Sequence, residues 1–158
     1  LKDPIFINRK MKGLYVWESS WEGLPDSEDN QYKFGVQIIP YQEIIDKYKD
    51  ATIIYRSINY NNDNFNKENL IKVHNVVHNK PYDINPIDWL NTCIHKDTHP
   101  QKTNCFWCSA LVGYIYSMCG ILNKKTDWSL LTPSDFSIIS ENLDFCENSY
   151  LSNFEELI

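Results

Sequence analysis

The stretch NCFWCSALVGYIYSMCG, which runs from Asn104 to Gly120, decides the fold of this 158-residue chain. Between Cys105 and Cys119 it is apolar on nearly every face of a helix. Gly120 is the residue type expected just past the end of a helix. We therefore predict a buried central helix in this stretch.

Cys108 is the candidate nucleophile of this helix. If Thr103 or Asn104 caps the helix, the Cys108 thiol lies within about its first turn, where unpaired amides and the helix dipole stabilise a thiolate. Buried cysteines more often pack as small hydrophobic residues, which we expect of Cys105 and Cys119. Position alone leaves a reactive and an inert Cys108 as open alternatives.

Shorter patterns on either side of this stretch predict an α+β fold in a single domain over residues 1–158. Apolar spacing and turn residues mark the other elements. The predicted strands are Gly13–Ser20, Phe34–Ile39 and Ala51–Ile58, and the predicted helices follow Pro40, span Lys67–His78, and begin with Thr132 as cap and Pro133 as first residue. The acidic, turn-rich segment 21–33 predicts an exposed loop.

Charge and composition exclude several classes of function. With 15 basic and 21 acidic side chains, the net charge is -6, and without a basic excess we expect no nucleic-acid partner. No run approaches the roughly 18 apolar residues of a membrane helix, so we expect a soluble protein without a transmembrane segment. Five cysteines form an odd set in a chain too large to need disulfides, which indicates reduced thiols and a reducing compartment.

Two groups of residues could hold a metal ion. The first group is Cys93, His95, His99, Cys105 and Cys108, which are residue types that zinc binds. They lack the paired ligand couples of a structural zinc site, so zinc is the weaker alternative. His74 and His78 are one helical turn apart, but no acid lies near them in the sequence, which favours a solvated helix face. We expect no metal and no cofactor.

Glu18 follows an aromatic strand in the segment WESS. A carboxylate at the end of a strand can hold a histidine in one tautomer, as the third member of a nucleophile and base system. A single acid in this position is more often a surface residue, so Glu18 alone does not identify a site.

Six segments between residues 13 and 136 carry a resemblance to a known family. In chain order they are GLYVWESS, FGVQIIPYQEII, ATIIYRSI, NKPYDIN, FWCSALVGYIYSMCGIL and LTPSDF. They resemble the circularly permuted branch of the NlpC/P60 papain-like superfamily, which includes bacterial YiiX-like proteins and related poxvirus proteins. The resemblance implies a permuted papain-like fold, in which an antiparallel sheet packs against the buried helix that bears the cysteine.

The resemblance also implies roles for four residues. Cys108, in the motif CSALV, is the implied nucleophile, and Cys105 is not. Glu18 is the implied residue that orients the catalytic histidine. Tyr82, in KPYD, is expected to border the site, and Ser109, next to the nucleophile, is expected to contact substrate.

One part of the family pattern is missing from the chain. In the permuted order the histidine precedes the WES strand, in a short His-Val-Gly segment that leads into a loop like KDPIF. The chain begins at that loop, and none of its histidines, which are His74, His78, His95 and His99, matches the motif position. We expect that the strand with the histidine either lies upstream of Leu1 or has been lost.

These observations favour a cysteine hydrolase or acyltransferase that cleaves an amide, ester or thioester of a peptide or lipid acyl substrate through a Cys108 acyl-enzyme. The alternative is a catalytically inactive member of the fold that serves as a structural or binding component of a large assembly, such as a virus particle. Protein partners would then be expected. In either case we expect the protein in the cytoplasm or in a virion.

Overall fold

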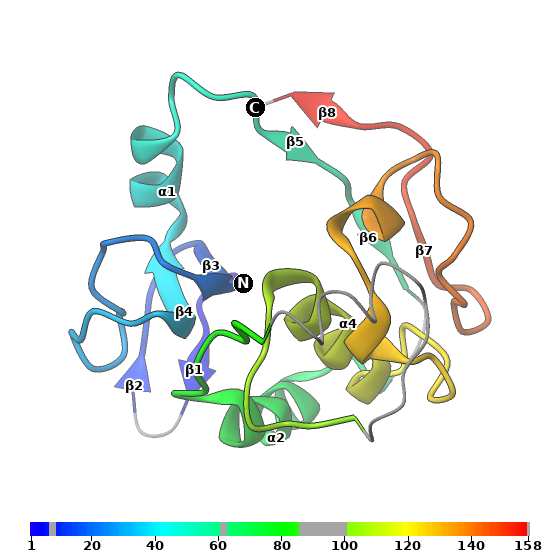
Figure 1. Ribbon diagram of the computed structural model, residues 1–158, viewed down its shortest axis with the longest axis horizontal. Coiled ribbons are helices and arrows are strands. Elements are labelled where there is room, and N and C mark those ends of the chain that lie inside the picture. The colour runs from blue at the N-terminus through cyan, green and yellow to red at the C-terminus, as the bar shows by residue number, and fades with distance from the viewer. Residues whose placement is uncertain (7–8, 61–62, 86–100, 158) are drawn as a thin grey trace.

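A computed structural model describes residues 1–6, 9–60, 63–85 and 101–157, which form an α+β fold of helices and short antiparallel strand pairs (Figure 1). The helices are α1 (Tyr41–Lys47), α2 (Lys67–Val77), α4 (Cys108–Met118) and the 3-10 helices η1 (Trp128–Leu130) and η2 (Pro133–Phe136). The strands are β1 (Ile5–Phe6), β2 (Arg9–Lys10), β3 (Tyr15–Ser20), β4 (Gly35–Pro40), β5 (Ile54–Tyr55), β6 (Ile58–Asn59), β7 (Tyr150–Leu151) and β8 (Glu156–Leu157). The predicted α+β class is confirmed.

The longest strand pair is formed by β3 and β4, the first two predicted strands. They run antiparallel in a register that joins Tyr15 to Pro40 at one end and Ser20 to Gly35 at the other. All residues of β4 before Pro40 are buried. Helix α1 follows β4 directly, as the sequence predicts, and α2 occupies the predicted range to within one residue.

Helix α4 lies at the centre of the core, in contact with α2, β3 and η1 (Figure 1). The prediction of a buried helix is confirmed, although the helix begins at Cys108 and not at Cys105. The residues before Cys108 do not join the helix because the N–H of Phe106 donates to the Pro81 carbonyl oxygen (3.1 Å) and Trp107 is extended. Gly120 follows the helix with a positive φ of 70°, as its place in the sequence predicts.

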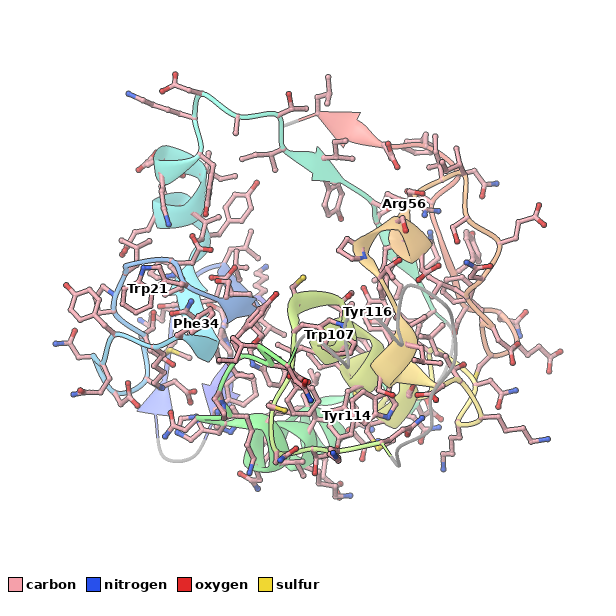
Figure 2. All side chains as sticks on the ribbon, in the orientation of Figure 1. Trp21, Phe34, Arg56, Trp107, Tyr114 and Tyr116 are labelled. Carbon is pink, nitrogen blue, oxygen red and sulfur yellow. The ribbon has the colours of Figure 1, made fainter. Side chains whose placement is uncertain are left out.

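Aromatic side chains fill the space around α4. Tyr114, labelled in Figure 2, lies on the helix, and Trp107 is the residue just before it. Phe106 and Trp128 pack against Tyr114 with ring centroids 5.4 and 5.1 Å away. The Trp107 indole N–H donates to the Leu131 carbonyl oxygen (3.1 Å). These contacts hold the start of α4 against the segment that follows it.

The third predicted strand is divided into two shorter ones. β5 pairs with β8 and β6 pairs with β7, so the last part of the chain packs back onto residues about a hundred positions earlier (Figure 1). Arg56, labelled in Figure 2, joins these pairs to η2 by donating to the carbonyl oxygens of Phe136 (2.6 Å) and Ser152 (2.6 Å). The predicted cap of η2 is confirmed, with Thr132 as N-cap and Pro133 first.

The acidic segment 21–33 forms a loop, but the prediction that it is exposed is wrong for part of it. Asp26 is only 1% exposed and Glu22 is also buried. Each carboxylate is paired with a lysine, Asp26 with Lys33 (2.6 Å) and Glu22 with Lys47 (2.7 Å). Buried ion pairs therefore hold the loop in place, although the sequence pattern alone assigns these charged side chains to the surface.

Four cysteines lie in the described residues, and each is a thiol outside any disulfide: Cys105, Cys108, Cys119 and Cys146. Cys93, His95 and His99 fall in the segment 86–100, outside the described residues, so the first of the two predicted metal groups is described only in part. Across the described residues, every helix is too short or too polar to cross a membrane.

Candidate active site

Cys108 is the first residue of α4, and its side chain is exposed. The N-cap residue Trp107 has an extended backbone and provides no side-chain cap, and the first turn of the helix contains no acidic residue. The first amides of a helix have no partner within it, and the positive end of the helix dipole lies there. The thiol is thus placed where a negative charge on sulfur is stabilised.

Tyr82 lies in a segment that is hydrogen-bonded to the residues just ahead of Cys108, and it is within electrostatic reach of that thiol. The segment around it is held by backbone bonds on both sides: the Tyr82 N–H donates to the Phe34 carbonyl oxygen (3.0 Å), and the Asp83 N–H donates to that of Phe106 (3.3 Å). The Tyr82 ring stacks on Phe34, 4.9 Å between centroids. Burial raises the pKa of the Tyr82 hydroxyl, and negative charge on Cys108 and Asp83 raises it further.

Ser109 lies next to Cys108 on the buried side of α4. Its side chain is 4% exposed and its hydroxyl donates to the Leu131 carbonyl oxygen (2.6 Å). The hydroxyl therefore anchors the helix to the segment after η1. The expected contact of Ser109 with a substrate stays a prediction.

Glu18 lies on β3, directly opposite Gln37 on β4, and one carboxylate oxygen lies 3.5 Å from the Gln37 amide nitrogen. Burial raises the pKa of the Glu18 carboxyl to about 7, together with the negative charge of Glu22, against the hydrogen bond from Ser20 and the charge of Lys47. Cys108 is not among these partners. The strand that carries Glu18, β3, contacts the helix that begins with Cys108, α4.

The two described histidines are not at Cys108. His74 is 1% exposed, and its ring nitrogen Nε2 lies 2.8 Å from a carboxylate oxygen of Glu28, with Nδ1 of His78 3.2 Å from the same oxygen. The prediction that His74 and His78 form a solvated helix face is therefore wrong. The sequence pattern does not reveal this pairing, because Glu28 lies 46 positions from His74 in an acidic loop that the pattern assigns to the surface.

The outer edge of β3 is paired only at its start. The backbone N–H of Tyr15 donates to the Leu1 carbonyl oxygen (2.7 Å), and the Leu1 amino group donates back to that of Tyr15 (2.6 Å). From Val16 to Ser20 this edge has no strand partner among the residues that the structure describes. Glu18 therefore lies on a strand with one free edge.

Comparisons of the chain with protein-family models, with curated proteins and with solved structures found no match. What the site does must therefore be argued from its own geometry: an exposed thiol at a helix N-terminus, a tyrosine beside it, and a carboxyl with a raised pKa on the neighbouring strand.

Proposed function

We propose that the protein is a cysteine hydrolase or acyltransferase with a permuted NlpC/P60-like fold, and that Cys108 is its nucleophile. The observation that carries this proposal is the exposed thiol at the first residue of α4, with Tyr82 beside it. Cys119, at the opposite end of α4, is buried, and burial raises the pKa of its thiol to about 11, which makes it a poor nucleophile.

In the proposed reaction the Cys108 thiolate attacks the carbonyl carbon of an amide, ester or thioester. The bond to the leaving amine, alcohol or thiol breaks, and the acyl group is carried as a thioester on the sulfur. Water or an acceptor nucleophile then releases it. The N–H groups of Cys108 and Ser109 in the first turn of α4 would stabilise the oxyanion, because they point toward the place where negative charge develops.

The general base of the proposed reaction is a histidine on a strand along the free edge of β3, as in the family that the sequence resembles. A strand that continued the pairing of Leu1 with Tyr15 would run antiparallel along this edge, and the third residue ahead of Leu1 would lie opposite Glu18. The Glu18 carboxylate would then orient an imidazole and stabilise its protonated form. This pairing would also lower the raised pKa of Glu18.

The substrate class follows from the resemblance alone: a peptide or a lipid acyl group. The superfamily includes peptidoglycan peptidases and enzymes that act on lipid acyl chains. The negative net charge of the chain, -6, argues weakly against an anionic membrane as the substrate.

The second candidate is a catalytically inactive member of the fold that acts as a structural or binding component of an assembly such as a virus particle. One observation favours it: both described histidines contact Glu28 and neither contacts Cys108. The two candidates differ in whether a base reaches the thiol.

The test is to incubate the full-length gene product with acyl p-nitrophenyl esters and peptide esters, and to measure intact mass after rapid acid quench. The proposal predicts an acyl adduct that maps to Cys108, is absent in Cys108→Ala, and persists in the matched variant Cys146→Ala. An adduct that survives in Cys108→Ala would contradict the proposal. No adduct on any cysteine, with no histidine encoded ahead of Leu1, would establish the inactive alternative.

A further inference from the structure

Glu28, His74 and His78 bring three potential metal ligands together, and Cys108 is not one of them. One ligand atom from each lies within 4.8 Å of the others. In the described part of the chain, this is the only group of three such side chains. We propose that these three residues form a zinc-binding site, which joins the loop 21–33 to helix α2. This proposal is independent of the function proposed for Cys108.

His74 lies in the last turn of α2, and His78, four residues later, is the C-cap residue of that helix, with 4.8 Å between the two ring centroids. A pair with this spacing can bind one zinc ion from a single helix. The third ligand comes from the loop, where the Glu28 N–H donates to an Asp26 carboxylate oxygen (2.8 Å). Asp26 is itself buried and paired with Lys33, so the backbone that carries Glu28 is fixed.

The ligands are oriented before any metal binds. The His74 ring stacks on Phe6, with 4.3 Å between centroids and an interplanar angle of 3°. Its side chain is 1% exposed, that of Glu28 is 7% exposed and that of His78 is 22% exposed. The site is therefore closed to solvent on the side of His74 and accessible to solvent on the side of His78, where an ion can enter.

The three side chains are close enough to bind a single ion once the imidazoles turn. Zinc binds nitrogen and oxygen at about 2.0–2.2 Å, so two ligands of one tetrahedral ion lie about 3.4 Å apart. The Glu28 oxygen lies 2.8 Å from Nε2 of His74 and 3.2 Å from Nδ1 of His78, and all three ligand atoms lie within 4.8 Å of one another, so the two imidazoles would rotate toward a shared ion. Two histidines and one glutamate are a known zinc ligand set that leaves a fourth position for water.

The charge of the surroundings also suits a cation. Glu28 is itself an anion, and Asp29, the next residue, lies within electrostatic reach of His78. Without metal the same atoms would form a hydrogen-bonded cluster in which Glu28 accepts from both imidazoles. Zinc would take the place of the protons in these bonds: a neutral imidazole would keep its proton on the other ring nitrogen, and an imidazolium would release one proton to solvent.

The test uses the purified full-length protein, stripped with chelator and equilibrated with Zn²⁺ near pH 7.5. The proposal predicts one equivalent of bound zinc and a rise in melting temperature. In His78→Gln and in Glu28→Gln the zinc affinity should fall at least about tenfold, because even changes to residues that only contact the ligands weaken metal binding by that factor. The rise in melting temperature with zinc should disappear accordingly. Lys72→Gln, an exposed change on the same helix, is the matched control and should bind as the wild type does.

Cobalt substitution distinguishes this site from the cysteines. Co²⁺ bound by Glu28, His74 and His78 would give visible tetrahedral bands without thiolate-to-metal charge transfer, and the spectrum would be unchanged in a Cys105→Ser, Cys108→Ser double variant. Three results would overturn the proposal: less than about a tenth of an equivalent of zinc in the wild type, equal affinity in His78→Gln, or a thiolate band that disappears in the double variant. The wild-type stoichiometry and spectrum decide the matter even if a variant fails to fold.

Discussion

The Ser19 hydroxyl donates to the backbone carbonyl oxygen of Phe106 across 2.6 Å, although the two residues are 87 positions apart. Ser19 lies on β3, next to Glu18, and Phe106 lies two residues before Cys108. The bond is buried and joins the strand of the proposed orienting acid to the segment that enters α4. It fixes the relative position of two elements on which the proposed site depends.

Replacing Ser19 with alanine should destabilise the fold by about 1–2 kcal/mol, because it removes a buried hydrogen bond and leaves the Phe106 carbonyl with only a longer one from Asp83 (3.3 Å). Urea unfolding of the variant measures this loss. Ser134→Ala removes an exposed hydroxyl and should change the free energy of unfolding by less than about 0.5 kcal/mol. Equal losses in the free energy of unfolding for the two variants would contradict the stabilising role assigned to the Ser19 hydrogen bond.

Gly35 allows the close approach that positions Tyr82. A Cβ atom at this residue would lie 2.3 Å from the Lys80 carbonyl oxygen and 2.8 Å from the Pro81 Cα atom, both backbone atoms. Gly35→Ala should therefore destabilise the protein by at least about 2 kcal/mol more than Gly13→Ala. Gly13 also has a positive φ but has open space around it, so the pair separates the steric clash from backbone strain. Chemical denaturation of both variants gives the difference, and similar losses would contradict the role assigned to Gly35.

In the protein of residues 1–158, without the pairing strand proposed above, Glu18→Gln should raise the free energy of unfolding at high pH and not at low pH. The pKa of Glu18 is raised from 4.5 to about 7 in the folded state, so the folded protein binds this proton more tightly than the unfolded chain does. The stability that the protonated carboxyl contributes is present below pH 4.5 and is lost as pH rises to about 7. Above pH 7.5 the free energy of unfolding of the variant should exceed that of the wild type by about 2 kcal/mol. This is less than the energy that corresponds to the full pKa shift, because the Glu18 side chain is partly exposed to solvent.

Urea unfolding of Glu18→Gln and wild type at pH 5, 6, 7 and 8 tests this prediction. The difference should grow between pH 5 and pH 7 and then level off. Glu43→Gln, an exposed change on α1, is the control and should give a flat profile. A difference that stays constant with pH would mean that the Glu18 carboxyl is not the group that titrates.

Tyr82→Phe should slow the alkylation of Cys108 at pH 7 by about three- to tenfold while the fold stays intact. Tyr82 lies within electrostatic reach of Cys108, and we predict that its phenol hydroxyl donates to the thiolate, so that its loss would disfavour the thiolate. The ring stacking on Phe34 does not need the hydroxyl, so the melting temperature should hardly move. Tyr32→Phe, at an exposed tyrosine, should leave the alkylation rate unchanged. An unchanged rate in Tyr82→Phe would remove the tyrosine from the site.

The elements that could be predicted are those with a local signal. β3, β4, α1, α2 and α4 each carry apolar spacing or turn residues within their own sequence, and they lie where that spacing places them. The start of α4 was missed because Phe106 gives its N–H to Pro81, a contact that no helix pattern contains. The division of segment 51–58 was missed because its partners, β7 and β8, come from the far end of the chain.

The site could be predicted where a single motif defines it. The motif CSALV placed Cys108 in the first turn of the helix, and α4 begins at that residue. The place of Tyr82 at the site, taken from KPYD, stays a prediction. The partners of Glu18, Gln37 and Glu22, depend on strand register and on the return of the loop onto α1. Glu28 was overlooked as a partner of His74 for the same reason: loop acids look exposed in the sequence, and only the fold buries them.

The most direct test of the central claim is the rate at which iodoacetamide modifies each cysteine at pH 7, followed by peptide mapping. If Cys108 is an activated nucleophile, it should react at least about tenfold faster in the folded protein than in the same protein unfolded in urea, where exposure is complete. Cys146, free and half-buried, and Cys119, buried, should react more slowly folded than unfolded. A Cys108 that reacts no faster in the folded state would contradict the claim that α4 activates it.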